Sequence, residues 1–377
     1  MEPPTATDST ASATTAPAPL PLLTLDEILA YQPAPDEQIW PEGILCKGVP
    51  TGIIGAPGAG KSRLTLQAAI CTILGKPFLQ WETKGAELKW LFLQTENGTR
   101  RLKSDLSAMT ASLSAADRMR VNEHLRILDI MAMDFCSICM ADGSPQRERI
   151  MATLEVWPAD IVVIDPLRDA GSGDLNGDAD MTATCKGIAA IIRRDNPKRV
   201  PLIVHHGRTG AVEASKVFGG DAASFGRNSK VLNGWLRSQI NIAPAGVNHP
   251  DTVIVGCGKC SDGPKWEPFA ARLNVHTRFY EVLEDFDLHE WERQAVNPSK
   301  RNAVAPTPEQ VLEVVNAAGG RIVGGQNDAK GLHQKLQTAF RCTRDAATQA
   351  IENALGNTIL EDKEPGKGRS KIAYIVK

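Results

Sequence analysis

A phosphate-binding loop is the strongest chemical signal in the chain. The stretch GAPGAGKS, from Gly55 to Ser62, matches the pattern G-x-x-x-x-G-K-[ST] in full. Glycines let main-chain N–H groups converge on phosphate oxygens, and a helix that starts after the loop points the positive end of its dipole at the same place. We therefore expect ATP to bind here, with the Lys61 ammonium on the β- and γ-phosphate oxygens. The expected ATP-binding residues are Gly55, Ala56, Pro57, Gly58, Ala59, Gly60, Lys61, Ser62, Arg63 and Asp165.

Two oxygen donors are expected to hold Mg²⁺ beside this loop. The Ser62 hydroxyl closes the motif, and Asp165 ends the apolar run ADIVVID further along the chain. A carboxylate at the tip of a strand next to the loop is well placed to reach the metal shell. Ser62 and Asp165 are therefore the predicted metal ligands.

Hydrolysis also needs a group that orients water. Glu96 closely follows the apolar run WLFLQ, at the carboxyl end of a predicted strand, where open α/β sheets build their sites. We expect Glu96 to be the catalytic base; the alternative is a residue that merely precedes the helix in GTRRLKSDL. The run LIVHH ends in His205 and His206, and we expect His206 rather than His205 to sense the γ-phosphate. A metal-binding pair fits less well, because neighbouring residues on a strand point to opposite faces.

Apolar runs of strand length alternate with helical segments along the chain. Strands are expected at 48–55, 87–96, 159–166 and 199–206, and helices at 61–75 and 180–195. The succession of strand, crossover helix and strand predicts an α/β fold with a mostly parallel sheet. From Lys230 onward, further strands are expected at 230–244, 251–259 and 278–285, as an antiparallel continuation of the sheet.

Composition divides the chain into four predicted parts. Residues 1–22 are rich in Pro, Ala, Ser and Thr and are expected to be disordered. Residues 23–292 form the expected ATPase domain, and 293–306 form a linker. Residues 307–377 are expected to form three helices and a β-hairpin, a small winged-helix-like domain. From Lys300 onward, twelve Lys and Arg face eight Asp and Glu, so this domain is expected to bind duplex DNA or, alternatively, a partner protein.

Overall composition excludes several classes of protein. A net charge of −2 over 377 residues gives no global basic field. No apolar stretch is long enough for a membrane span, and the first basic residue is Lys47, too late for a secretory leader. Eight cysteines in a chain this long do not indicate a disulfide scaffold, so a reducing, cytoplasmic location is expected.

Two C-x-x-C pairs are candidates for a zinc site. Cys136 and Cys139 form one pair, and Cys257 and Cys260 the other. The gap between the pairs far exceeds the spacing of a zinc ribbon. Incidental or buried thiols are the favoured interpretation, ahead of a Cys₄ zinc site or a redox switch.

These motifs, in this order, resemble those of the RecA-like ATPases, and in particular the RepA-type hexameric replicative helicases of plasmids and phages. The matching stretches are GAPGAGKS, LFLQTENGTRRL, VVIDPLRD, LIVHH, GRNSKVLNGWLRSQ and VGCGKCSDGP. They span roughly Leu23 to Val282; the N-terminal tail and the C-terminal domain lie outside the resemblance.

The resemblance implies a ring of subunits, a hexamer, with ATP at each interface. Glu96 would be the catalytic base and His206 the γ-phosphate sensor. A basic residue of the neighbouring subunit would complete the site and stabilise the transferring phosphoryl group. Arg237 is the first choice for this arginine finger, with Arg227 and Lys259 as companions, and Arg237 is expected within a strand.

Two glycine-rich segments are expected to face single-stranded DNA in a central pore. They are residues 168–181, after Asp165, and 207–230, after the histidines. The second carries Arg208, Lys216 and Arg227 as candidate phosphate contacts, and only Phe218 and Phe225 as aromatic residues. The first is acidic, a poor ligand for DNA by charge, and its role stays open.

The sequence therefore predicts an ATP-driven, ring-forming DNA motor, a replicative helicase of a plasmid, phage or mobile element. The alternative is an ATP-gated DNA-binding or recombination-mediator protein that unwinds nothing. A P-loop kinase for a small molecule is disfavoured, because no lid or acceptor pocket is evident and the arginine segment would be unexplained.

Overall fold

A computed structural model describes residues 22–85, 87–129, 143–171, 173–207, 217–219, 221–226, 230–246, 249–296, 305–323, 331–340, 342–364 and 371–377. The chain divides into two compact units, Met1–Glu37 and Gln38–Lys377. In the first unit, helix α1 (Leu25–Leu29) begins at a capping box formed by Thr24 and Glu27. Most of the segment predicted to be disordered, residues 1–21, lies outside the described residues.

A nine-stranded sheet formed by described residues is the centre of the second unit. Its strand order is β11-β10-β9-β8-β3-β7-β6-β4-β5. The strands are β3 (Thr51–Gly55), β4 (Trp90–Gln94), β5 (Leu125–Ile127), β6 (Ile161–Asp165), β7 (Val200–His206), β8 (Ser238–Pro244), β9 (Thr252–Cys260), β10 (Phe269–Leu273) and β11 (Tyr280–Leu283). The six strands from β8 to β5 pair in parallel, and β9, β10 and β11 continue the sheet antiparallel. The predicted α/β class, mostly parallel sheet and antiparallel continuation are confirmed.

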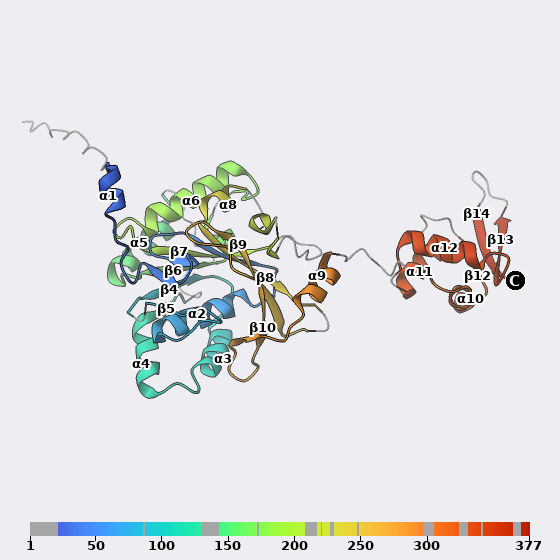
Figure 1. Cartoon of the computed structure of the whole chain (residues 1–377), viewed down its shortest axis with the longest axis horizontal. Coiled ribbons are helices and arrows are strands. Elements are labelled where there is room, and N and C mark those ends of the chain that lie inside the picture. The colour runs from blue at the N-terminus through green and yellow to red at the C-terminus, as the bar shows by residue number, and fades with distance from the viewer. Residues whose placement is uncertain are drawn as a thin grey trace, which may run out of the picture. The chain divides into compact units, whose positions relative to one another are not determined.

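Helices cover both faces of this sheet, as a mostly parallel sheet requires. They are α2 (Lys61–Leu74), α3 (Thr99–Met109), α4 (Ala115–His124), α5 (Pro145–Val156), α6 (Asp178–Ile192) and α8 (Lys230–Trp235). Helices α2, α3 and α4 lie on one side, and α5, α6 and α8 on the other (Figure 1). Strands β3, β4 and β6 are buried along their whole length. Each face therefore has its own apolar cluster, and the sheet edge between them is left for polar residues.

The elements that carry the predicted site form as expected. Helix α2 starts directly after the glycine loop, and Gly75 closes it with a positive φ of 64°. Strand β3, which leads into the loop, pairs with β7 on one side and β8 on the other. The loop therefore lies at the middle of the sheet, at the carboxyl edge of its parallel strands.

Two expectations about the second half of the domain need correction. Residues 230–235 form helix α8 instead of the start of a strand, because Leu232 packs into the apolar cluster on that face. Strand β10 was not expected at all. The helical α9 (Leu288–Val296) follows β11, and a short β1–β2 pair (Gln38–Trp40 and Leu45–Cys46) precedes β3.

The C-terminal elements have an apolar core of their own. They are α10 (Pro308–Ala317), β12 (Arg321–Val323), α11 (Leu332–Phe340), α12 (Arg344–Ala354), β13 (Ile359–Glu364) and β14 (Lys371–Val376). Thr307 and Gln310 form the expected capping box at the start of α10. The three strands form one antiparallel sheet, β12-β14-β13. The three expected helices and the expected hairpin are therefore present, with β12 as an additional strand.

None of the described helices is long and apolar enough to cross a membrane.

Candidate active site

The glycine loop connects β3 to α2 through a backbone that excludes side chains. Gly58 and Gly60 have φ angles of +77° and +80°, which residues with a Cβ rarely adopt. A Cβ on Gly55 would lie 2.5 Å from the carbonyl oxygen of Ile242 on the neighbouring strand β8. A Cβ on Gly60 would lie 1.8 Å from the hydroxyl of Tyr280. Packing therefore requires glycine at position 55, conformation favours it at position 58, and both apply at position 60.

Lys61 lies at the bottom of the loop, where α2 begins. Its side chain is buried, and Nζ donates hydrogen bonds to the carbonyl oxygens of Gly55 at 3.0 Å and Ala56 at 2.9 Å. Burial lowers the pKa of Lys61, while the nearby carboxylates of Asp165 and Glu96 raise it. Lys61 therefore lies beside both predicted acidic residues, although these come from separate strands of the sheet.

Asp165 and Ser62 form an oxygen-donor pair that fits Mg²⁺. Asp165 ends β6 and is 3% exposed, and burial raises the pKa of its carboxyl to about 6, against a lowering by hydrogen bonding from Ser62. A divalent cation would offset this penalty, because it stabilises the ionised carboxylate. Mg²⁺ commonly uses one or two protein oxygens plus water and phosphate oxygens, and the described residues hold no cluster of three His, Cys, Asp or Glu suited to a metal. The predicted pair is therefore sufficient for Mg²⁺ but not for a metal bound entirely by protein.

Glu96 and His206 meet above the loop. Glu96 lies two residues past the end of β4, and its Oε1 is 3.5 Å from Nε2 of His206, at the end of β7. The Glu96 side chain is 41% exposed and that of His206 is 18% exposed, so water reaches the carboxylate. Burial and the Lys61 charge lower the pKa of His206, and Glu96 opposes them by raising it.

His205 and His206 point in different directions, as expected for neighbours on a strand. His205 is 2% exposed and pairs with Ile54 in the register of β3 and β7, whereas His206 pairs with Gly55 at the start of the loop. The structure brings His206, rather than His205, to Glu96.

Several polar residues at this edge were not predicted as site residues. Thr95 donates a hydrogen bond to Asp169, which lies in a short 3₁₀ segment (Leu167–Ala170) after Asp165. Arg63, whose place in the loop was predicted, donates to Asp105 on α3 at 3.0 Å. Arg63 was predicted because it directly follows the motif; Thr95 and Asp169 depend on a contact between residues 74 positions apart.

Arg237 and Lys259 lie at the opposite edge of the sheet from the loop. Arg237 directly precedes β8, instead of lying within a strand, and the next residue, Ser238, pairs with Thr51 at the start of β3. The loop begins at the other end of β3, roughly 13 Å away at about 3.3 Å per residue. The Arg237 side chain is 52% exposed, with Nη2 3.2 Å from Oδ1 of Asp262. Burial and the charge of Arg237 lower the pKa of Lys259, whose Nζ donates to the carbonyl of Asn233.

The remaining predicted residues fall into two groups. Arg227, Arg208, Lys216, Cys136 and Cys139 lie outside the described residues. Phe225 is buried, and the ring of Phe218 lies 5.9 Å from that of Trp291. Burial therefore keeps Phe225 from stacking with bases, whereas Phe218 is only half-buried.

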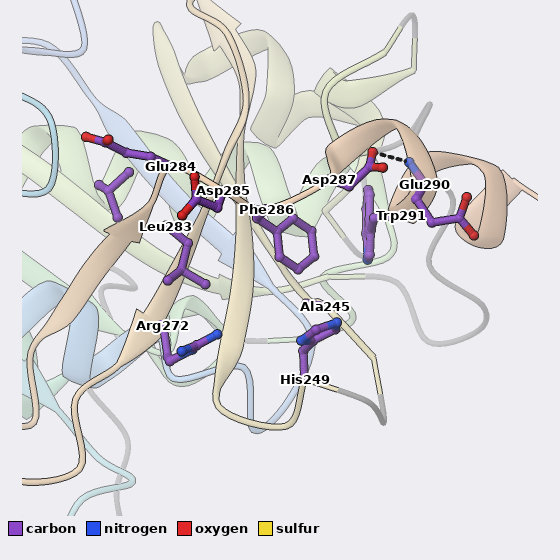
Figure 2. A pocket seen from close by; sticks show the side chains of 11 residues that line it. Ala245, His249, Arg272, Leu283, Glu284, Asp285, Phe286, Asp287, Glu290 and Trp291 are labelled. Atoms are coloured by element: carbon purple, nitrogen blue, oxygen red, sulfur yellow. Dashed lines mark hydrogen bonds between the residues drawn. The ribbon is translucent and has the colours of Figure 1, made fainter.

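A cavity of 670 Å³ has no residue of the phosphate-binding loop in its described lining, and Figure 2 shows the side chains that line it. Its described lining comes from the ends of β8, β10 and β11 and from α9, and includes the aromatic side chains of His249, Phe286 and Trp291. Four carboxylates also line it: Glu284, Asp285, Asp287 and Glu290. These four carboxylates outnumber the one cationic side chain among the described lining residues, Arg272, so the cavity is a poor match for a triphosphate.

Comparisons with known proteins identify the type of domain. Residues 14–211 match the family model described as AAA domain. The solved structures that match the chain include a KaiC-like protein from the hyperthermophilic archaeon Pyrococcus horikoshii OT3, the RadB recombinase and, from a third protein, an ATPase domain. The KaiC-like protein is 10% identical to the chain, with a TM-score of 0.43, and the match covers 66% of this chain and 94% of that one. The RadB recombinase is 14% identical, with a TM-score of 0.40 and coverages of 63% and 92%. The ATPase domain is 12% identical, with a TM-score of 0.44 and coverages of 63% and 86%. No curated protein sequence matches.

Proposed function

The chain belongs to the AAA domain family of P-loop ATPases, and we propose that its hydrolytic centre consists of Lys61, Ser62, Asp165, Glu96 and His206. The observation that carries this proposal is the meeting of Glu96 and His206, 3.5 Å apart, beside the Lys61 ammonium. These side chains come from three different strands and one helix. Their convergence at the end of a phosphate-binding loop supports a common chemical task.

Each residue has a distinct task in this proposal. Lys61 and the loop N–H groups hold the β- and γ-phosphates, and Ser62 and Asp165 hold Mg²⁺, which neutralises charge on the phosphate oxygens when bound. Glu96 orients a water molecule and accepts its proton as the water attacks the γ-phosphorus. His206 contacts Glu96 through Nε2 and changes partner when the γ-phosphate is present.

Arg237 is proposed to act on the ATP of a neighbouring copy. Its place at the far edge of the sheet keeps it from its own glycine loop, and its half-exposed guanidinium is available to another subunit. An arginine supplied in this way stabilises charge on the transferring phosphoryl group and links hydrolysis to assembly. Lys259 is proposed as a companion cation, because its charge interacts with that of Arg237. Arg227 is proposed as a second companion from the sequence alone.

We further propose that the assembled protein is a DNA motor, a replicative helicase of the RepA type. The cations Arg208, Lys216 and Arg227 would contact single-stranded DNA in the pore of a hexamer. The C-terminal domain, residues 307–377, is proposed to have the winged-helix form and to bind duplex DNA or a partner protein. A domain of this form that recognises duplex DNA would also fit the second candidate function, an ATP-gated DNA-binding protein that unwinds nothing.

Strand separation on a forked DNA substrate distinguishes these two functions. We expect the wild-type chain to hydrolyse ATP faster with single-stranded DNA and to release the labelled strand. The control Lys61→Ala should do neither, because its loop lacks the cation that holds the phosphates. DNA-stimulated hydrolysis without strand release would reject the helicase and support the ATP-gated binder.

A further inference from the structure

A buried hydrogen bond links the strand end that carries Glu96 to the segment that follows Asp165. The Thr95 side chain is 5% exposed, and its Oγ1 donates to Oδ2 of Asp169 at 2.5 Å. Thr95 comes directly before Glu96, and its main-chain N–H donates to the carbonyl of Asp165 at 3.1 Å. The residue before Glu96 is thus fixed by both its side chain and its main chain.

The residues on the other side of Glu96 are fixed as well. The Gln94 side chain accepts a hydrogen bond from the N–H of Asn97 at 2.8 Å and donates one to the carbonyl of Leu128 at 3.2 Å. Gln94, Thr95 and Asn97 are all buried, so Glu96 is the exposed residue within a run of fixed neighbours. The position of its carboxylate therefore depends on the hydrogen bonds that hold the turn.

Asp169 joins this turn to a second charged group. Its Oδ1 accepts a hydrogen bond from Nε of Arg168 at 3.2 Å, and its Oδ2 accepts the one from Oγ1 of Thr95. Arg168 lies close enough to His206 to contribute to the lowering of its pKa. One carboxylate thus orders the backbone beside Glu96 and a cation beside His206.

We propose that Asp169 is a positioning residue that holds the Glu96 carboxylate in place through Thr95. The inference rests on the proposed function, since it takes Glu96 to be the group that orients water. A water-orienting carboxylate must stay within hydrogen-bond reach of the reacting water, and a displacement of about 1 Å can lower a rate by about a hundredfold. Asp169 touches neither the phosphates nor the water in this role; it acts on the turn.

Steady-state kinetics of Thr95→Val, Asp169→Ala and the double variant test the inference. We expect each single variant to lower kcat by about tenfold or more, with KM for ATP and the half-saturating Mg²⁺ concentration within about twofold of wild type. Because both variants break one hydrogen bond, the double variant should lose no more than the worse single one. Thr95→Ser keeps the hydroxyl and should keep kcat.

The control Thr182→Val removes a hydroxyl that bonds to the Asp178 carbonyl within α6 and should leave kcat unchanged. A wild-type kcat in both Thr95→Val and Asp169→Ala would overturn the inference. So would losses that multiply in the double variant, or a shift confined to KM or to the Mg²⁺ requirement, which would make Asp169 a ligand-binding group. Melting temperatures of all variants show which losses of kcat come from unfolding. If Thr95→Val does not fold, Asp169→Ala decides alone.

The variant Glu96→Gln separates this inference from the proposed function. If Glu96→Gln keeps the wild-type kcat, Glu96 is not the base and the proposed function fails, whatever Asp169 does. If Glu96→Gln loses turnover while Thr95→Val and Asp169→Ala keep it, only the positioning role fails.

Discussion

Asp165 is a charged group in a position that penalises charge. Burial raises the pKa of its carboxyl from 3.8 to about 6, in spite of the neighbouring Lys61 and Ser62. The folded chain therefore binds this proton more tightly than the unfolded chain does. The free energy of unfolding falls as pH rises from about 4 to about 6 and stays lower above that, by about 3 kcal/mol at most. The buried Asp165 carboxylate, a predicted metal ligand, therefore lowers the free energy of unfolding at neutral pH.

Asp165→Asn should relieve this penalty while it abolishes Mg²⁺-dependent hydrolysis. In urea unfolding without nucleotide or metal, we expect the variant to gain stability over wild type, with a gain about 1 kcal/mol larger at pH 8 than at pH 5. Asp195→Asn is a control that should lose stability instead of gaining it. Hydrogen bonding from Arg199 lowers the pKa of Asp195, so the ionised carboxylate stabilises the folded chain. Equal stability changes of Asp165→Asn at the two pH values would contradict the account of burial.

Residues that belong to a local pattern could be predicted from the sequence, and those that depend on distant contacts could not. Lys61 and Ser62 stand in a contiguous motif, and Asp165, Glu96 and His206 each end an apolar run. The structure brings all five to one edge of the sheet; their roles stay predictions. Tyr280, by contrast, reaches Gly60 from 220 positions away, and no local spacing signals that contact.

At the level of elements, the parallel strands were predictable because each is a continuous apolar run that is buried along its length. Helix α8 was wrongly predicted as a strand. In a segment of six residues, apolar residues at 231, 232 and 235 do not separate a strand buried on both faces from a helix. Packing of Leu232 into the apolar cluster on one face of the sheet accompanies the helix. Strand β10 has only five residues, FAARL, and it was missed because its extended form depends on pairing with β9 and β11.

The start of α2 is held from the antiparallel part of the sheet. Tyr280 opens β11, is buried, and packs its hydroxyl against Gly60. Its main chain exchanges two hydrogen bonds with the Gln67 side chain, at 2.7 and 2.8 Å. The hairpin of β10 and β11 therefore supports the glycine loop.

Tyr280→Ala should destabilise the fold by about 3 kcal/mol and weaken nucleotide binding, because the loop loses its support. Tyr280→Phe keeps the ring and the main-chain bonds to Gln67, so it should lose much less stability; any weaker nucleotide binding in it measures the part of the support that comes from the hydroxyl beside Gly60. Urea unfolding and titration with a fluorescent ATP analogue measure the two effects. A destabilised Tyr280→Ala that binds the analogue as tightly as wild type would show that the hairpin does not support the loop.

For the molecule as a whole, the sheet separates two chemically different edges. Lys61, Asp165, Glu96 and His206 lie at the carboxyl edge of the parallel strands, and Arg237 lies at the opposite edge. A single copy cannot bring Arg237 to its own loop through a packed sheet. If both edges serve one reaction, they must come from two copies of the chain.

Mixed assemblies test this claim most directly. Lys61→Ala and Arg237→Ala chains with different affinity tags are co-expressed, and particles that carry both tags are purified and assayed for ATP hydrolysis. We predict near-zero turnover for each variant alone and clear turnover for the mixed particles, because an intact loop of an Arg237→Ala copy meets the arginine of a Lys61→Ala neighbour. Mixed particles no more active than either parent, or wild-type turnover by Arg237→Ala alone, would contradict a site shared between copies.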